Sequence, residues 1–520
     1  MTDNFPHFNA ELYSPDFESA VQMLAYAVEN YPERTAIIYE GDQISYREYG
    51  NCVAGMAAEL AKFDLPGERV VMLNPNSITS AVAAYAIWAA GGQIAQLNPL
   101  YTEREINPLV EEIKPKIILC GSEFKARLLP AVKKSGASDL LILDEGSLNL
   151  THWRDGADVS LPTPFPNGDD PALFLFTGGT TGVPKGAMHN HTSLLMTGRL
   201  LQASWRVETG QEIFMNVAPQ SHSWGMCSSI LMPVLTCNTV VTLPKFHPQL
   251  VLDELVHHNV TVFAGGPAAI YNAILTLPDL VSADLSQLHL CFGGGSIFNN
   301  ETVNNWRQVT GNSIYVAYGM SEMAPIAMHR TGQEPKVGTV GLPVYRSEVQ
   351  VVDLENSDRI LPDGENGEFR IKGPNMLSTY WNRPEETANT VRDGWIYTGD
   401  IGHFDEDGMV VIADRKKDMA IVGGYNVFPR EIDEILYAHP AILEAAALGM
   451  PDKYRGEVIH AFAALRPGAE ANEEEIIEYC RQNLAKYKVP EKINIIDALP
   501  KTPANKIDKQ QLRQIALKHD

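Results

Sequence analysis

The 520-residue chain is too long for one simple core, so its length predicts a large multi-part domain with at least one smaller companion. It carries 41 Lys and Arg against 64 Asp and Glu, a formal net charge of −23, which repels nucleic acid and anionic membrane surfaces and argues against a polyanionic partner. A composition of 45% hydrophobic and 20% charged residues is that of a globular chain, not a disordered or collagen-like one.

The cysteines and the start of the chain indicate the compartment. The six cysteines lie far apart, include no C-x-x-C pair and are typical of reduced core thiols rather than disulfides or a zinc site. The first residues lack the basic segment and apolar run of a signal peptide, and no window reaches the ~18 uncharged apolar residues of a membrane span. We therefore expect a cytoplasmic protein.

Between about residues 15 and 300, helical apolar spacing alternates with short β-rich runs, which predicts α/β sheets. These runs are Ala36–Tyr39, Val70–Leu73, Ile117–Cys120, Leu140–Leu143 and Val240–Leu243.

From about residue 340 the pattern changes to short alternating strands with turn signals, which predicts a β-rich subdomain. The expected strands are Ser347–Val352, Gly367–Lys372 and Met409–Ala413. After a charged stretch at 414–418, helices expected near Pro429–Ala438 and Glu473–Leu484 indicate a compact α+β domain of roughly 100 residues. The predicted fold class is thus α/β, with a large N-terminal domain over residues 1–414 and a small α+β C-terminal domain over residues 418–520.

The sharpest local feature is a Gly- and Thr-rich loop that follows the apolar run Phe174–Phe176 and ends at Lys185. Glycines let backbone N–H groups approach phosphate oxygens, Thr hydroxyls donate further hydrogen bonds, and Lys adds positive charge. A Walker A loop is excluded, because it would need Gly at Pro184 and Ser or Thr at Gly186. The candidate nucleotide-binding residues here are Thr177, Gly178, Gly179, Thr180, Thr181, Gly182 and Lys185.

This loop resembles the phosphate loop of the adenylate-forming superfamily, which includes acyl-CoA synthetases, luciferases and the adenylation domains of peptide synthetases. Gly178 stands where that family often has Ser, and acyl-CoA synthetases of the fatty-acid type commonly carry Gly there. The resemblance continues in the same order along almost the whole chain. It implies ATP, Mg²⁺ and coenzyme A as cofactors or co-substrates, and a carboxylic acid as substrate.

Two further segments resemble the family's motifs around the acid. Residues 219–225 match its P-x-x-H-x-x-G segment, which implies that His222 lies beside the reacting carboxylate and α-phosphate and that Trp224 lines the acyl pocket. The turn at 293–296 passes close to adenine and the acyl chain in relatives, which implies roles for Gly294, Gly295 and Ser296.

Residues 318–322 resemble the family's Y-G-x-[ST]-E motif. The resemblance implies that Tyr318 stacks on adenine, that Ser321 contacts phosphate with Gly319 and Met320 beside it, and that Glu322 binds Mg²⁺, for which Thr177 is a second candidate ligand.

The resemblance extends through the predicted boundary. Asp400 follows an expected aromatic strand that begins at Trp395 and ends before the acid. Asp400 and Arg415 match positions that hold the ribose hydroxyls, and Lys417 matches the hinge, here residues 415–417, about which the small domain moves. The loop with Gly424 and Tyr425 is then expected to meet the pantetheine of CoA.

Near the end of the chain, residues 500–507 resemble the P-[KR]-T-x-x-G-K-[IV] motif, whose Lys enters the site for adenylation. That position is Lys506, and Asn505 replaces the usual Gly. Asn tolerates left-handed backbone geometry better than most residues, so the turn can survive.

The implied mechanism has two half-reactions. The carboxylate attacks the α-phosphorus of ATP while Lys506, Lys185, Thr180 and Thr181 stabilise the developing charge, so that acyl-AMP and pyrophosphate form. The small domain then turns, withdraws Lys506, and lets the CoA thiolate displace AMP. The catalytic candidates are Lys506, His222 and Thr181.

The acid is less closely defined. The positions that line the acyl pocket in relatives are uncharged here, which favours a fatty or aromatic acid over an amino acid. They include Trp224, Met226, Gly266, Cys291 and Ile326. Bulky Trp224 could block a long tunnel, which would suit short-to-medium or ring-bearing acids.

Alternatives stay open at this point. Taken alone, His222 is a hydrogen-bonded structural histidine, Glu322 and Lys506 are solvated, and Arg415 is a linker charge. A carrier-protein thiol could replace CoA, and a catalytically silent acyl- or nucleotide-binding protein could keep the fold. A homodimer is also left open.

Overall fold

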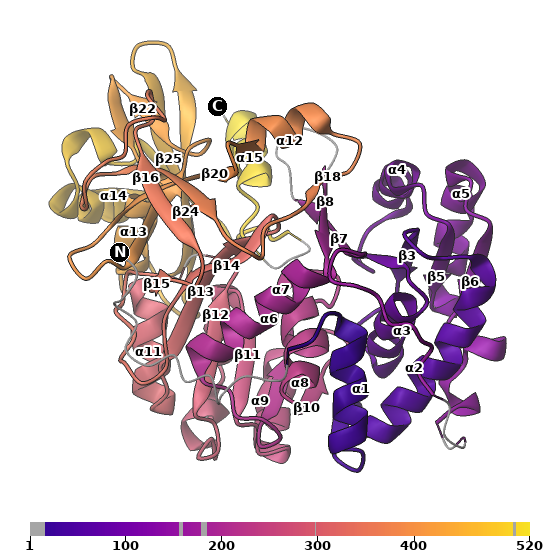
Figure 1. Ribbon diagram of the computed structural model, residues 1–520. Coiled ribbons are helices and arrows are strands. Elements are labelled where there is room, and N and C mark those ends of the chain that lie inside the picture. Colours follow the sequence, from indigo (N-terminus) through magenta and orange to yellow (C-terminus); the bar gives the residue numbers. More distant parts are fainter. Residues whose placement is uncertain are drawn as a thin grey trace.

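The computed structural model describes residues 16–154, 156, 160–177, 185–296, 298–502 and 506–519. Two large sheets lie side by side, the seven-stranded one to the right and the nine-stranded one to the left in Figure 1, and two five-stranded sheets lie above them. Among the described residues, no helix is both long enough and apolar enough to cross a membrane.

The seven-stranded sheet is parallel in its centre and ends in an antiparallel hairpin that carries the phosphate-loop sequence. Strands β3 and β5 are almost wholly buried, as expected for parallel strands covered on both faces. In spatial order the strands are β18 (Thr379–Tyr380), β8 (Lys185–Asn190), β7 (Pro171–Thr177), β4 (Gln93–Leu97), β3 (Arg69–Leu73), β5 (Ile117–Cys120) and β6 (Asp139–Ile142).

The nine-stranded sheet is parallel from β1 to β13 in its interior and antiparallel at both edges. In spatial order its strands are β15 (Leu342–Pro343), β14 (Met323–Met328), β13 (Ile314–Met320), β12 (Leu290–Gly294), β11 (Val262–Gly266), β9 (Ile213–Asn216), β10 (Thr239–Thr242), β1 (Thr35–Tyr39) and β2 (Asp42–Ser45). In open α/β sheets, ligands bind beyond the carboxyl ends of the parallel strands, so the ends of β9, β11, β12 and β13 mark the expected site.

Helices form three layers around these two sheets, with a shared apolar core between the sheets. The middle layer contains α1 (Ala20–Asn30), α2 (Tyr46–Leu60), α3 (Ile78–Ala89) and α6 (His191–Trp205). The outer layers are α4 (Glu103–Ile113) with α5 (Lys125–Ser135), and α9 (Pro248–His257) with α10 (Ala268–Leu275) and α11 (Asn300–Thr310). Because α6 contacts both β7 and β14, it ties one sheet to the other.

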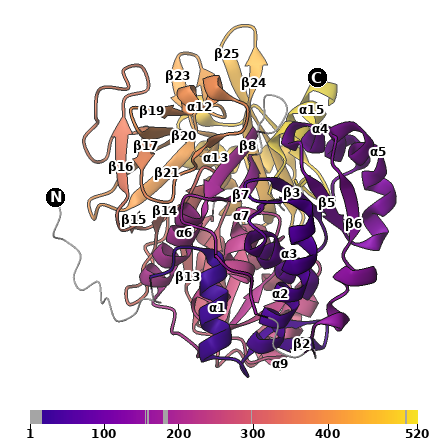
Figure 2. The same ribbon diagram turned by 45° about the vertical axis from the view of Figure 1, so that its right-hand side comes forward.

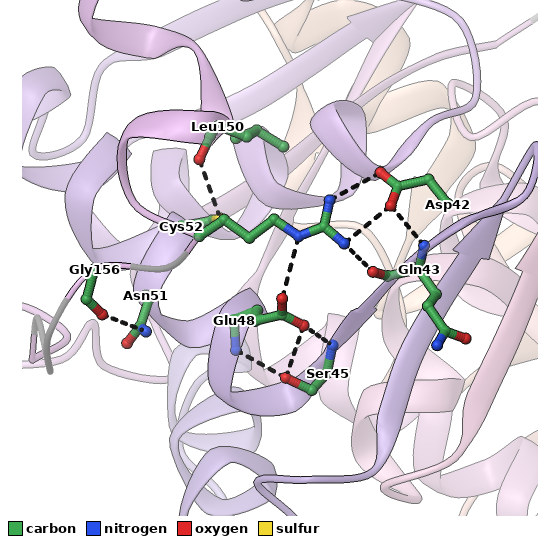
Figure 3. Close-up of polar contacts among 9 residues, drawn as sticks. Asp42, Gln43, Ser45, Glu48, Asn51, Cys52, Leu150 and Gly156 are labelled. Carbon is green, nitrogen blue, oxygen red and sulfur yellow. Dashed lines mark hydrogen bonds and ion pairs between the residues drawn. The ribbon is translucent and has the colours of Figure 1, made fainter.

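The connection that contains Leu150, Arg154 and Gly156 is held against α2 by polar contacts (Figure 3). Arg154 donates to both oxygens of Asp42, at 3.0 and 2.9 Å, and to Glu48 at 3.2 Å, while Glu48 also closes a capping box with Ser45 at the start of α2. A capping box satisfies amide groups that a helix start leaves unpaired. One arginine thereby ties this connection to the β2–α2 corner.

The β-rich subdomain follows as predicted, with one difference. Its strands are β16 (Glu348–Val352), β17 (Gly367–Lys372), β20 (Trp395–Phe404), β19 (Val391–Arg392) and β21 (Val410–Arg415). The sequence suggested that the aromatic strand ends before Asp400, but β20 continues to Phe404. It continues because Ile401 is fully buried and residues 400–404 stay paired with β21.

The last sheet contains β22 (Ala420–Val422), β23 (Tyr425–Val427), β24 (Ile442–Asp452), β25 (Gly456–Leu465) and β26 (Lys492–Ile495). It packs with α13 (Pro429–Tyr437), α14 (Glu473–Asn483) and α15 (Lys509–His519), and Figure 2 shows β24, β25 and α15 at the top of the molecule. We call residues 420–519 the C-terminal unit. The predicted α/β fold class is confirmed, whereas hinge motion stays a prediction.

All six cysteines are free thiols and all are buried, as the sequence predicted. They are Cys52, Cys120, Cys227, Cys237, Cys291 and Cys480. Burial raises the pKa of the Cys227 and Cys291 thiols to about 12.

Candidate active site

The β-rich subdomain presents an acidic and a basic side chain to the end of β13. Asp400 on β20 accepts a hydrogen bond from the Tyr318 hydroxyl at 2.6 Å, and its other oxygen lies 3.4 Å from Nε of Arg415 on the paired strand β21. Burial raises the pKa of Asp400, while Arg415 and the Tyr318 hydrogen bond act in the opposite direction. The three residues predicted to hold the nucleoside are thus in direct contact.

The Y-G-M-S-E motif forms the tip of the β13–β14 hairpin. Met320 pairs with Met323, so Ser321 and Glu322 are the turn residues. Glu322 is only 6% exposed, and burial raises the pKa of its carboxyl group although a Tyr380 hydrogen bond, Arg415 and Lys185 oppose the rise. A buried carboxylate is costly without a cationic or hydrogen-bonding partner, and its hard oxygen atoms are the ligands that Mg²⁺ prefers.

The phosphate loop is described only at its two ends. Thr177 at the end of β7 pairs with Lys185 at the start of β8, and the Lys185 ammonium lies 5.5 Å from the centre of the Tyr380 ring. The residues between these ends that we predicted to bind phosphate lie outside the described part of the chain: Gly178, Gly179, Thr180, Thr181 and Gly182.

Lys506 reaches the end of β12 from the C-terminal unit. Its amide donates a hydrogen bond to the Thr502 hydroxyl at 3.2 Å, and its carbonyl accepts one from the Thr502 amide at 2.7 Å. Asn505 lies outside the described residues. The Lys506 ammonium lies 4.0 Å from the point where a side chain on Gly295 would begin. Burial, and then Arg415, lower the pKa of Lys506 to about 8 while Asp400 opposes them, so the lysine belongs electrostatically to the nucleoside group.

His222 is a neutral imidazole beside this lysine. Burial and the nearby Lys506 charge lower its pKa to about 3. Its Nδ1 accepts a hydrogen bond from the Trp224 amide at 3.3 Å, which assigns the proton to Nε2. His222 can therefore donate one hydrogen bond from Nε2 to an oxygen atom of a substrate.

Trp224 lies across two strand ends that lack side chains. A Cβ atom on Gly266 would lie 3.3 Å from the Trp224 Nε1, and one on Gly294 would collide with the indole ring. The Trp224 ring centre is 6.4 Å from that of Trp205, which stacks on Phe292 at 3.5 Å. Glycine at these strand ends thus makes room for an aromatic wall.

Not every predicted pocket residue joins this wall. Met226 is buried in the same apolar core as Trp224. Cys291 instead packs with Trp306 on the opposite face of β12, because adjacent residues of a strand point to opposite faces and Phe292 takes the Trp205 side. Ile326 packs with Tyr380 beneath the β-rich subdomain. We therefore leave Cys291 and Ile326 out of the proposed pocket.

The remaining predicted residues hold turns. The Ser296 hydroxyl accepts a hydrogen bond from the Ala268 amide at 2.9 Å, which fixes the β12 exit against the start of α10. Gly319 packs tightly against Ala324, where a Cβ atom would approach to 2.8 Å. Lys417 lies in the turn between β21 and β22, and Gly424 and Tyr425 lie on the exposed β22–β23 hairpin.

Two contacts at this site were missed from the sequence. Tyr380 donates its hydroxyl proton to Glu322, and His189 contacts the Ser321 carbonyl at 2.8 Å through Nε2. Tyr380 lies in a two-residue strand without periodicity, so nothing local indicated it. His189 offered a weak signal, since it follows the phosphate loop closely along the chain.

Comparison with known proteins decides the family. The family model described as AMP-binding enzyme matches residues 24–381, and the model of the AMP-binding enzyme C-terminal domain matches residues 431–506. This chain belongs to the AMP-binding enzymes. As a member of that family it is an ATP-dependent acid–CoA ligase.

The relatives of this AMP-binding enzyme act on different acids. A long-chain-fatty-acid--CoA ligase of Bacillus subtilis (strain 168) is 32% identical, with 98% of this chain and 96% of the relative covered. A feruloyl-CoA synthase of Amycolatopsis sp is also 32% identical, covering 93% and 96%. The crystal structure of ATP-bound MatB from Rhodopseudomonas palustris superposes with a TM-score of 0.88 at 30% identity, covering 96% and 99%. Similarity at this level fixes the reaction class and leaves the acid open.

Proposed function

We propose that this AMP-binding enzyme joins an apolar carboxylic acid, in the first place a fatty acid, to CoA through an acyl-AMP intermediate. One observation carries the proposal: Lys506 of the C-terminal unit lies partly buried beside Gly295, and its charge acts on His222. A cation at the junction of a nucleoside group and an uncharged aromatic wall suits a reaction between an α-phosphate and an apolar acid.

The residues divide the first half-reaction among them. Tyr318, Asp400 and Arg415 hold the nucleoside, the acid lies along Trp224, and its carboxylate attacks the α-phosphorus. Lys506 neutralises the negative charge that develops as pyrophosphate leaves, and His222 donates its Nε2 proton in a hydrogen bond to a reacting oxygen. Neutral His222 adds no charge and so does not compete with Lys506 for the carboxylate.

Glu322 is the side chain best suited to hold Mg²⁺, with Thr177 as the second candidate. The Glu322 carboxylate is buried, accepts a hydrogen bond from the Tyr380 hydroxyl, and feels the charges of Arg415 and Lys185. When bound, Mg²⁺ would partly neutralise the negative charge of the ATP phosphates. Tyr380 orients the carboxylate for that task.

The second half-reaction requires the C-terminal unit to turn about residues 415–417. Lys506 then leaves the site, and the Gly424–Tyr425 hairpin approaches it so that the CoA thiolate can displace AMP. Gly424 has φ +86°, a conformation that glycine adopts without strain, so the hairpin keeps a thin turn for the pantetheine arm. The domain limits 1–414 and 418–520 are part of this proposal.

A ring-bearing acid is the second candidate, because the Trp224 indole fills the space that Gly266 and Gly294 leave open. A flat aromatic wall at the strand ends favours stacking with a planar acyl group, and it shortens the path available to a long chain. Short or medium fatty acids and aromatic acids both fit that description.

The deciding experiment measures pyrophosphate release from Mg-ATP with fatty acids of increasing length, aromatic acids and amino acids, each with and without CoA. We expect activity with apolar acids and formation of acyl-CoA, whereas pyrophosphate without a thioester would indicate a different thiol acceptor. Silence with every acid would contradict the proposal. Trp224→Ala should shift the preference toward longer acids, while Trp153→Ala, whose ring packs against Gly55 of α2, should not. A cytoplasmic location and a homodimer stay predictions.

A further inference from the structure

A buried asparagine joins the two large sheets behind His222. Asn76 lies in the loop between β3 and α3, on the seven-stranded sheet, and is 6% exposed. Its Oδ1 accepts a hydrogen bond from the Gln220 amide at 2.7 Å, and its Nδ2 donates to the Ala218 carbonyl at 3.0 Å. Both partners belong to the segment that follows β9 of the nine-stranded sheet.

The contact is reciprocal. The Gln220 side chain is 1% exposed, and its Oε1 accepts a hydrogen bond from the Ser77 amide at 3.4 Å. Three hydrogen bonds therefore cross between the two sheets at one buried point. A buried amide paired at both ends fixes its neighbour in two directions, and losing it leaves a buried backbone group without a partner.

The held segment carries both residues that face the acid. The His222 amide donates to the Pro219 carbonyl at 2.9 Å, so the histidine is one short turn away from Asn76's partners. Gly225 packs so closely against Pro219 that any side chain there would collide with the Pro219 carbonyl. The segment is stiff, and a shift at residues 218–220 is passed on to His222.

A second route leads to Trp224. Asn216 at the end of β9 also donates to the Ala218 carbonyl, at 2.8 Å. The Ser228 hydroxyl contacts Asn216 Oδ1 at 2.8 Å and the Trp224 carbonyl at 2.7 Å. Asn76 thus holds, from the other sheet, the same carbonyl group that anchors this chain of contacts.

We propose that Asn76 is a positioning residue for the acid: through Ala218 and Gln220 it sets where His222 Nε2 and the Trp224 ring face the carboxylic acid. This rests on the proposed function. Among the described residues, the hydrogen bonds of the Asn76 side chain go to Ala218 and Gln220 and not to the nucleoside group or Glu322, so its influence should fall on the acid and not on ATP.

The test compares Asn76→Ala with Asn74→Ala. Asn74 is a matched control, because it lies in the same loop, is 7% exposed, and its hydrogen bonds to described residues stay within its own loop and helix, at Ser77 and Ser80. Asn76→Ala should raise KM for the acid and lower the rate of acyl-AMP formation by about 10- to 100-fold, since small displacements at a reacting group cost this much. KM for ATP should stay within about twofold of wild type for both variants.

Asn76→Asp separates positioning from folding. It keeps the volume and the acceptor for the Gln220 amide, but it sets a carboxylate oxygen against the Ala218 carbonyl. We expect the same split between KM for the acid and KM for ATP, measured well below the unfolding midpoint of each variant. The proposal is overturned if Asn76→Ala and Asn76→Asp change only the midpoint of thermal unfolding, or if KM for ATP rises as much as KM for the acid.

Failure of the proposed function would look different, since the wild-type enzyme itself would then be silent with every acid. In that case a crystal structure of Asn76→Ala still decides the role of Asn76. Displacement of residues 219–225 supports it, and an unchanged segment overturns it.

Discussion

Lys506 and the Gly423–Gly424 turn belong to the same C-terminal unit but have different surroundings. Lys506 lies against Gly295, and its pKa responds to Arg415 and Asp400. A Cβ atom added at Gly424 would meet no other atom within 4 Å, and the neighbouring Tyr425 is 59% exposed and stacks only on Tyr487 of its own unit among its described ring contacts. One surface of the unit is engaged in the site while the other faces solvent.

A single orientation of the C-terminal unit can therefore serve only one of the two half-reactions we propose. The described arrangement suits adenylation, because it delivers a cation to the strand ends. Polar contacts help to hold it: Arg466 pairs with Glu301, Glu434 accepts a hydrogen bond from the Asn300 amide at 3.3 Å, and Arg430 donates to the Ile412 carbonyl. Weak polar contacts between domains are what a unit that must change orientation needs.

Lys506→Ala removes the ammonium group beside Gly295 and should have the largest effect. We expect acyl-AMP formation to fall by about 10²- to 10³-fold, the cost of removing a group that stabilises transition-state charge. Single-turnover release of pyrophosphate measures this rate. Thioester formation from preformed acyl-AMP should be spared.

The matched control is Lys501→Ala, because Lys501 lies in the same segment but pairs with Glu444 inside the C-terminal unit. It should leave both half-reactions near the wild-type rates. Equal loss of the two half-reactions in Lys506→Ala would sink the role assigned to Lys506.

Lys417→Pro should impair the second half-reaction, which requires the C-terminal unit to turn. Proline fixes one backbone angle, so the turn between β21 and β22 could no longer rotate freely. We expect thioester formation from acyl-AMP and CoA to fall by about 10²-fold while pyrophosphate release persists. Lys417→Ala, which keeps the backbone free, should retain both rates, and a thioester defect of equal size in that variant would argue against a hinge here.

The rate of adenylation should depend on pH through the protonation of Lys506. Lys506 neutralises charge only when protonated, and its pKa is lowered to about 8, chiefly by burial. Thus kcat/KM for ATP should be level below that pH and fall about tenfold per pH unit above it. His222, with a pKa of about 3, stays neutral throughout this range and adds no limb.

Lys506→Arg provides the control, because a guanidinium stays protonated across the accessible range. In this variant the fall should move to higher pH, even if the maximum rate is lower. A fall that stays at the same pH would assign the titration to another group.

Arg466→Ala should have the smallest effect. The Arg466 and Glu301 side chains are 36% and 31% exposed, and pairs of this kind contribute about 0–1 kcal/mol. We expect the ratio of thioester formation to adenylation to rise by up to about fivefold, because the adenylation arrangement loses a contact. Arg481→Ala, which removes a pair within α14, is the control and should leave the ratio unchanged.

The sequence predicted best what depends on order along the chain. Tyr318, Asp400 and Arg415 were each assigned from a motif, and the fold brings them into contact. Contacts made by single side chains across long separations were not predictable. Asn76 and Gln220 are 144 residues apart, and His189 and Ser321 are 132 apart, so no local pattern links them.

Side-chain direction was the other limit. Cys291 and Phe292 are both apolar and adjacent, and only the packing of β12 decides which of them faces Trp205. Glycine at 293 and 294 removes the alternation that would have shown the buried face. The end of β20 was misjudged for a related reason, since Gly399 breaks the pattern with φ +71° while the pairing with β21 continues.

The burial of the cysteines limits a side reaction of the proposed acyl-AMP intermediate with the enzyme itself. Acyl-AMP acylates any thiolate that it meets, and only the ionised form of a thiol attacks readily. All six thiols of this chain are buried, and Cys291, in a strand whose end reaches the site, has its pKa raised to about 12. Because its thiols are buried and that of Cys291 stays protonated at neutral pH, the enzyme avoids acylating itself.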